Sequence, residues 1–149
     1  MLLVVGLVGC GTSDQNSGSN SEQIKTTESS QVNDFKVTLH LEENLEMYAT
    51  ITYSGEEAEV EINHGGSIFF FNIHQQDGSF EYESVMTEQL LTTNLVANEP
   101  YRVDFNQVKE LELNKGKYEF QAIADFSVSS NDGTVTPLKI PVSIVREIN

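Results

Sequence analysis

The sequence predicts an all-β fold, an antiparallel β-sandwich of about seven or eight strands. Apolar residues recur at every second position in several stretches after residue 34, as in half-buried strands. Turn dipeptides such as Ser54-Gly55 and Asp77-Gly78 separate these stretches. No stretch shows an amphipathic helical pattern of comparable clarity, so we expect strands throughout.

The expected strands follow one another along the chain. They cover residues 35–41, 45–53, 58–62, 67–74, 101–105, 118–126 and 138–144. Residues 67–74 are apolar on both faces, which favours a central strand. Pro137 and Pro141 place the last strand at an edge or a bulge, because proline cannot donate a ladder hydrogen bond. Residues 84–95 fit either a short helical turn or a strand and loop.

The N-terminal residues resemble the signal peptide of a bacterial lipoprotein. Leu7-Val8-Gly9-Cys10 ends an apolar run that starts at Leu2, and a tract rich in Gly, Ser, Asn and Thr follows. The resemblance implies that residues 1–9 are removed and that the Cys10 thiol receives a diacylglyceryl group, with acyl chains such as palmitate. Two acyl chains suffice for stable anchoring. The resemblance therefore implies a lipid anchor at the extracytoplasmic face of the cell membrane.

The same residues allow other interpretations. Residues 1–9 contain no Lys or Arg, whereas export signals begin with a positive region, so we expect the true start to lie upstream. A buried strand from Leu2 to Val8, with Cys10 in the core, is the alternative, but the following residues offer no partner strand. The apolar run is too short for a membrane-spanning helix, which needs about twenty residues.

Composition divides the rest of the chain into two parts. Residues 10–33 are almost entirely polar, with only Ile24 and Val32 as larger apolar residues, which predicts a flexible, disordered tether. Residues 34–149 have the length of one ordinary domain and are expected to form the sandwich.

The chain is strongly acidic, with 23 Asp and Glu against 8 Lys and Arg and a formal net charge of -15. This balance disfavours nucleic acid, whose phosphates require clustered basic residues. It also disfavours anionic head groups, so membrane attachment should depend on lipid. The acidic surface serves solubility or attracts a cation or a basic partner.

One short motif refines the predicted fold. Leu113-Asn114-Lys115-Gly116-Lys117-Tyr118 leads directly into an alternating strand and resembles the tyrosine corner of immunoglobulin-like domains. This assigns structural roles to Gly116 and Tyr118. The alternative is a hairpin turn at Lys115-Gly116 followed by an ordinary core tyrosine.

A larger part of the chain resembles the intracellular proteinase inhibitor family, the BsuPI domains. The matching features, in order, are the strand Met47 to Tyr53, an acidic turn before Ala58 to Ile62, the strand Ile68 to Ile73 running into Asp77-Gly78, Leu95 to Glu99, and the Leu113 to Tyr118 corner. Phe80 and Tyr82 stand where the family tends to carry tryptophans. The resemblance implies an immunoglobulin-like sandwich and inhibition of a protease.

The sequence offers no catalytic or metal-binding pattern. His40, His64 and His74 lack close metal-ligand spacing, and no Gly-x-Ser-x-Gly motif occurs. Glu57, Glu59 and Glu61 would project in a row about 7 Å apart along one strand face, which favours a solvated or partner-facing edge over a calcium site. We therefore expect no cofactor, no metal and no enzymatic activity.

These observations favour a lipid-anchored, non-catalytic binding or accessory domain of the cell envelope with a protein partner. Aromatic and Met side chains near a turn are typical interface anchors, which makes Phe80, Tyr82 and Met86 the candidate binding residues. The alternative is that these three side chains close the hydrophobic core at the end of the sandwich. A proteinase inhibitor that presents residues 75–95 as a protruding loop is the second hypothesis, and an envelope enzyme is the third.

Overall fold

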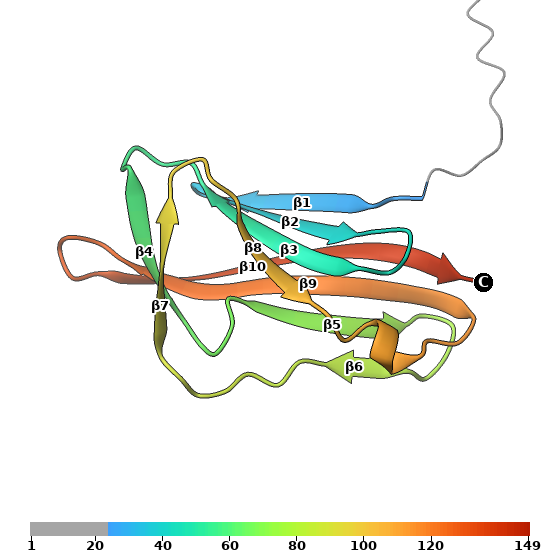
Figure 1. Ribbon diagram of the computed structural model, residues 1–149. Coiled ribbons are helices and arrows are strands. Elements are labelled where there is room, and N and C mark those ends of the chain that lie inside the picture. Colours follow the sequence, from blue (N-terminus) through green and yellow to red (C-terminus); the bar gives the residue numbers. More distant parts are fainter. Residues whose placement is uncertain (1–23) are drawn as a thin grey trace, which may run out of the picture.

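Residues 24–149, which the computed structural model describes, form two antiparallel β-sheets that pack face to face (Figure 1). The first sheet has the order β1 (Thr27–Val32), β2 (Phe35–Leu41), β3 (Met47–Tyr53) and β8 (Tyr101–Phe105). The second has the order β6 (Glu81–Glu83), β5 (Phe69–Gln75), β9 (Gly116–Ser129), β4 (Glu59–His64) and β7 (Leu91–Val96), and β10 (Val135–Ile148) pairs with β9. A short 3-10 helix, η1 (Lys109–Leu111), lies between β8 and β9.

The predicted all-β sandwich is confirmed. The strand order matches the immunoglobulin pattern, in which strands A, B and E face strands C, F and G. The neighbours β2, β3 and β8 take the places of A, B and E, and β5, β9 and β10 take those of C, F and G. The described residues contain ten strands, more than the predicted seven or eight, because β1, β6 and β7 add to the expected set.

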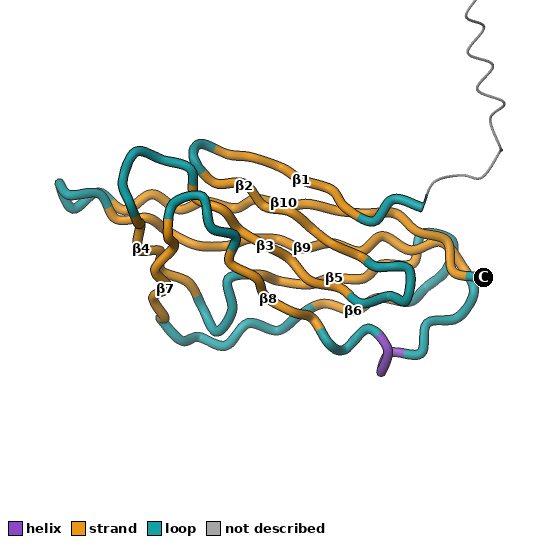
Figure 2. Tube along the Cα trace, turned by 45° about the horizontal axis from the view of Figure 1, so that its top comes forward, coloured by secondary structure: helices purple, strands orange, loops and turns teal. Residues whose placement is uncertain are grey.

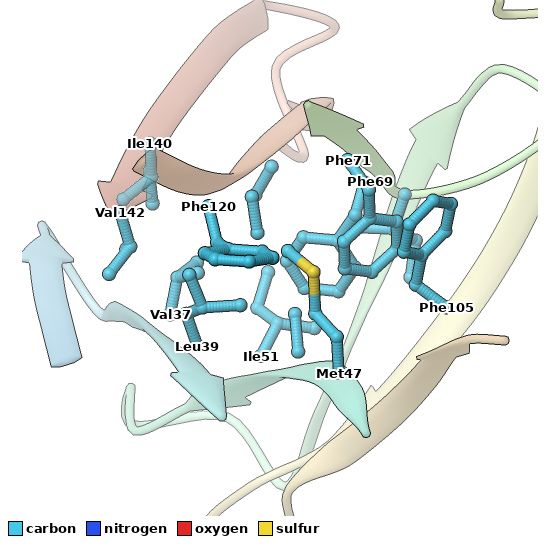
Figure 3. Packing of buried hydrophobic residues seen from close by; sticks show 14 of the residues in the cluster. Val37, Leu39, Met47, Ile51, Phe69, Phe71, Phe105, Phe120, Ile140 and Val142 are labelled. Atoms are coloured by element: carbon cyan, nitrogen blue, oxygen red, sulfur yellow. The ribbon is translucent and has the colours of Figure 1, made fainter. Parts of the chain in front are cut away.

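The core lies between the two sheets and is built from every second residue of their strands (Figure 3). Val37, Leu39 and Ile51 from the first sheet meet Phe120 and Ile140 from the second. Because side chains alternate between the faces of a strand, period-two sequences bury one face and expose the other.

The expected tether reaches too far along the chain. The expected signal peptide, residues 1–9, Cys10 and the expected tether up to residue 23 lie outside the described residues, but β1 falls within the predicted 10–33 range. It pairs with β2 from Thr27 opposite His40 to Val32 opposite Phe35. This strand is polar because it lies at the sheet edge and is held by ladder hydrogen bonds with little apolar burial. The sandwich therefore begins before residue 34.

Arg146 joins the two sheets near the end of β10. Its side chain is buried, and its guanidinium donates hydrogen bonds to the carbonyl oxygens of Lys25 at 2.8 Å, Leu41 at 2.7 Å and Glu42 at 2.6 Å. Burial lowers the pKa of Arg146, while the nearby Glu43 and Glu42 oppose this shift. The contact fixes the first described residues and the end of β2 against the last strand.

The last strand lies where its prolines predicted. Within the described part of the chain, β10 pairs only with β9, and Pro137 and Pro141 lie opposite Ser127 and Ile123. Prolines on an edge strand hinder further strand pairing, since they remove N–H donors from the ladder.

Candidate binding site

An open groove lies beside β8, at the edge of the first sheet. Its volume is about 420 Å³. Its apolar lining comes from three strands and one loop: Phe69 and Phe71 on β5, Val103 and Phe105 on β8, Tyr82 on β6, and Val85 and Met86. Polar residues, among them Ser84, Gln89, Asp104 and Gln107, complete the lining. We call it the β8 groove.

The floor of the β8 groove is continuous with the core. The rings of Phe71 and Phe105 stack with centroids 5.0 Å apart, and Phe69 lies 5.9 Å from Phe71 (Figure 3). Phe69 and Phe71 keep only 2% and 4% of their surface exposed. The groove therefore presents an apolar floor that is already packed and fixed in position.

The loop of residues 84–90 runs from β6 to β7 (Figure 2). Residues 84–87 and Gln89 of this loop line the groove. The Ser84 hydroxyl donates to the Phe71 carbonyl at 2.5 Å and accepts from the Phe71 N–H at 2.9 Å. The Ser84 N–H donates to Oδ1 of Asn72 at 3.2 Å. Ser84 thus replaces the next pair of the β5–β6 ladder and directs the chain away from β5.

Met86 fastens the middle of the same loop. Its Sδ accepts a hydrogen bond from the Ser67 N–H at 3.3 Å. Its side chain packs directly on Gly65, where a Cβ would lie 2.8 Å from Cγ of Met86 and 3.3 Å from the Thr87 carbonyl oxygen. Glycine at position 65 therefore permits the close approach of the loop.

Two apolar side chains of the loop point away from the core. Val85 is 93% exposed and Leu90 is 83% exposed. Val85 also lines the β8 groove, so an apolar side chain stands at its rim. Exposed apolar groups beside an apolar groove are typical of interaction surfaces.

The structure brings together two of the three predicted binding residues. Tyr82 and Met86 both line the β8 groove, and the Tyr82 hydroxyl donates to Oε1 of Gln107 at 2.5 Å. Phe80 instead packs against Tyr118, with ring centroids 6.1 Å apart, and does not line the groove. All three side chains are half-buried.

Gly116 and Tyr118 form the turn into β9. The buried Tyr118 hydroxyl donates to the Asn114 carbonyl at 2.9 Å, the hydrogen bond that a tyrosine corner makes. Gly116 has a φ of +154°, and a Cβ there would lie 2.6 Å from Nε2 of Gln75 and 2.9 Å from Oδ1 of Asp77. A side chain at position 116 would displace the Asp77 turn, because Asp77 also accepts from the Lys117 N–H at 2.9 Å.

The three histidines make separate contacts. His40 stacks on Tyr48 at 4.3 Å, and burial lowers its pKa. His64 contacts the Gly65 carbonyl oxygen at 2.7 Å and Oγ1 of Thr93 at 2.6 Å, while His74 lies 3.0 Å from Glu81. Among residues 24–149, no group of three or more His, Cys, Asp or Glu side chains is placed to hold a metal ion.

Sequence reasoning missed the floor of the groove. Phe69, Phe71, Val103 and Phe105 have the pattern of ordinary core residues, and they line an opening only because no strand of the described chain pairs with the outer edge of β8. The exposed Val85 and Leu90 carried a weak signal, since both are apolar within a segment without clear periodicity.

The fold and the groove define a class, an immunoglobulin-like β-sandwich with a surface groove of mixed polar and apolar lining at one sheet edge. No family model, curated protein or solved structure matches the chain. Within the described part of the chain, no helix has the length and apolar character that crossing a membrane requires.

Proposed function

We propose that this chain is a lipid-anchored, non-catalytic binding domain of the cell envelope, which recognises a protein partner through the β8 groove and the 84–90 loop. The lipid anchor is argued from the sequence Leu7-Val8-Gly9-Cys10. The observation that carries the binding function is the groove together with Val85, which lines it and is 93% exposed. Leu90, 83% exposed, belongs to the same loop but lines a separate hollow beside Phe70. Apolar anchors inside a rim that excludes water provide most of the affinity in protein interfaces.

The geometry supports recognition by a fixed surface. Ser84 and Met86 hold the loop against β5 and Ser67, so little conformational freedom is lost when a partner binds. The groove floor is packed into the core. Both features favour a preformed binding site.

The test is capture of membrane proteins on the immobilised full chain, compared with two double variants. V85S/L90S removes the exposed apolar groups of the loop. V135S/V145S removes two apolar groups of β10 that are 57% and 43% exposed and is the matched control. We expect a partner that the wild type and the control retain and that the loop variant loses. Equal retention by all three proteins would contradict the proposed surface.

The anchor requires its own measurement. C10S should move the chain from the membrane fraction to the soluble fraction of the producing cells and abolish incorporation of labelled palmitate, because serine cannot form the thioether. Unchanged membrane attachment would contradict lipidation at Cys10.

A proteinase inhibitor is the second candidate, and the 84–90 loop is the observation that favours it. Part of the segment expected to protrude, residues 75–95, forms the end of β5, β6 and the first five residues of β7, which leaves the 76–80 turn and the 84–90 loop outside the strands. Val85 is exposed, whereas hydrogen bonds to Phe71 and Ser67 hold its neighbours Ser84 and Met86 in place. Rigid exposed loops suit protease active sites because they are pre-organised.

Inhibition can be tested directly by titrating the chain into one serine, one cysteine and one metalloprotease with peptide substrates. Stoichiometric loss of activity with the loop uncleaved, and its absence in V85S/L90S, would support an inhibitor. Cleavage within residues 84–90 without inhibition would identify the loop as a substrate and contradict this function.

A further inference from the structure

The first sheet ends at β8 with an unpaired edge. β8 pairs with β3 from Met47 opposite Phe105 to Ile51 opposite Tyr101, and no other strand of the described chain pairs with it. The outer edge of such a strand offers N–H and C=O groups in the geometry that pairs with an incoming strand.

The free edge of β8 corresponds to a known position in the immunoglobulin sandwich. Strand E, whose place β8 takes, is followed in the sheet by strand D. The strand before β8 in the chain, β7, instead pairs with β4 from Glu59 opposite Val96 to His64 opposite Leu91. The ribbon of β4 and β7 runs across the direction of the other strands (Figure 1), so the place of strand D is left without a strand from residues 24–149.

The β8 groove lies beside this edge and can receive the side chains of an added strand. Val103 and Phe105 of β8 form part of its lining, and Phe69 and Phe71 of β5 lie across from them. Alternate residues of a strand added to β8 would point towards these rings, because side chains alternate between strand faces. Apolar residues at those alternate positions fit the aromatic floor.

The charges around the edge favour a basic partner. Asp104 lines the groove, Glu83 adjoins it at the end of β6, and Glu88 lies in the 84–90 loop between two lining residues. The nearest basic side chain on the strand, Arg102, forms an ion pair with Asp104 at 2.8 Å and lies 3.6 Å over the Tyr48 ring. This pair carries no net charge, so the net acidic charge of the rim comes from Glu83 and Glu88. Lys or Arg residues on the added strand would complement this acidic rim.

A second copy of the chain fits less well. It would bring another net charge of -15 and an identical groove that needs filling, instead of side chains that fill this one. Like charges facing across an interface oppose association.

We propose that the outer edge of β8 accepts an extended segment of a partner protein as an additional antiparallel or parallel strand, with alternate apolar side chains in the β8 groove and Lys or Arg residues against the acidic rim. This rests on the proposed binding function and specifies its partner. β8 is five residues long, so the pairing segment spans a similar length.

The probe is a capped synthetic heptapeptide of alternating Val and Lys, titrated into the ¹⁵N-labelled chain and followed by amide NMR. We expect saturable shifts at residues 101–105 and along the groove, together with slower amide exchange in β8. Two control peptides separate the contributions. Methylation of alternate backbone nitrogens should abolish binding because it removes the ladder donors, and replacement of Lys by Glu should weaken binding at least tenfold.

Matched variants test the charge on the protein side. D104K should weaken binding of the Val-Lys peptide about fivefold, as expected for losing an exposed favourable charge contact. D125K is the control, because Asp125 is similarly exposed and also faces a basic residue, Lys139, but lies on β9 away from the groove. Its affinity should stay within twofold of the wild type.

Several results would overturn the proposal. Absence of saturable shifts at millimolar peptide, or equal binding of the methylated peptide, would exclude strand addition at β8. Shifts at residues 101–105 that depend on protein concentration without peptide would assign this edge to a second copy. If the peptide fails while V85S/L90S still loses the membrane partner, strand addition is wrong and the proposed binding function stands.

Discussion

At the scale of single residues, Tyr118 fixes the connection that enters β9. Its hydroxyl is inside the protein and donates to the Asn114 carbonyl, and its ring packs against Phe80 and Phe120. The hydroxyl and the ring therefore contribute separately, one to the turn and the other to the core.

Tyr118→Phe keeps the ring and removes the hydrogen bond. We expect the free energy of unfolding to fall by about 1–2 kcal/mol, because the Asn114 carbonyl loses its buried donor. Urea denaturation measures this change. Tyr101→Phe is the control, since Tyr101 is 41% exposed, and should change the free energy by less than about 0.5 kcal/mol. Equal stability of both variants would mean that the corner adds nothing to stability.

His40 is a residue whose environment predicts a pH effect. Burial is the main cause that lowers its pKa; Glu42 opposes the shift, and Arg102 adds to it. The unfolded chain therefore binds the proton more tightly than the folded chain, and stability falls as the pH drops below the ordinary histidine range near about 6.5.

His40→Gln should flatten the pH dependence of stability in this range. The free energy of unfolding, measured in urea between about pH 7.5 and 5.5, should fall less in the variant than in the wild type, because glutamine does not titrate. His74→Gln is the control, as His74 is exposed beside Glu81. An unchanged slope in His40→Gln would show that other groups determine the acid sensitivity.

At the scale of elements, the strands differ in how strongly their sequences specify them. β2 and β3 were predicted because each buries one face and so alternates between apolar and polar residues. β1 was not predicted, because its sequence Thr-Glu-Ser-Ser-Gln-Val is stabilised by pairing with β2 and by contacts such as Ser29 Oγ to Thr38 Oγ1 at 2.8 Å. The apolar content of a segment predicts how much of it is buried. A polar strand at a sheet edge therefore has the same composition as a flexible tether.

Arg146 links three elements, and its replacement should show this. Arg146→Met leaves the Lys25, Leu41 and Glu42 carbonyls without their donor, and we expect a loss of about 3 kcal/mol in the free energy of unfolding. Arg146→Lys should recover only part of this loss, because an ammonium group cannot reproduce the planar fork of donors.

The control for this prediction is Arg102→Met. Arg102 is 53% exposed in an ion pair with Asp104, so its loss should cost about 1 kcal/mol or less. Urea denaturation of the three variants gives the comparison. Full stability of Arg146→Lys would mean that charge, and not the shape of the guanidinium, holds the strands together.

At the scale of the whole molecule, the sequence predicted the sandwich but did not predict the β8 groove. Period-two patterns depend on burial that is similar across many sandwiches. The β8 groove depends on the pairing of β7 with β4, a choice between two sheets that the sequence of residues 91–96 does not reveal. Tyr82 and Met86, which line the groove, were predicted as binding residues because their residue types are typical of interfaces, whereas Phe69 and Phe105 have the pattern of core residues.

The net charge of -15 is also a property of the whole molecule. The ion pairs of the described residues are all at least partly exposed, and such pairs contribute little to stability. Repulsion among the acidic groups should therefore dominate the electrostatic part of the stability.

Sodium chloride should consequently stabilise the fold. We expect the melting temperature to rise between about 10 mM and 500 mM salt, because screening shortens the reach of the repulsion from about 30 Å to a few ångströms. Calorimetry at constant pH measures the effect. A melting temperature that falls with salt would show that attractive pairs outweigh the repulsion.

The hydrogen bonds of Arg146 connect residues that are far apart in the sequence, so they can form only late in synthesis of the chain. The partners of Arg146, Lys25, Leu41 and Glu42, are separated from it by 121, 105 and 104 positions in the sequence. Arg146 can therefore bind the Lys25 carbonyl, just before β1, only after residue 146 has been synthesised. A chain that stops before residue 146 would lack these three hydrogen bonds, and β1 would be held mainly by its ladder to β2.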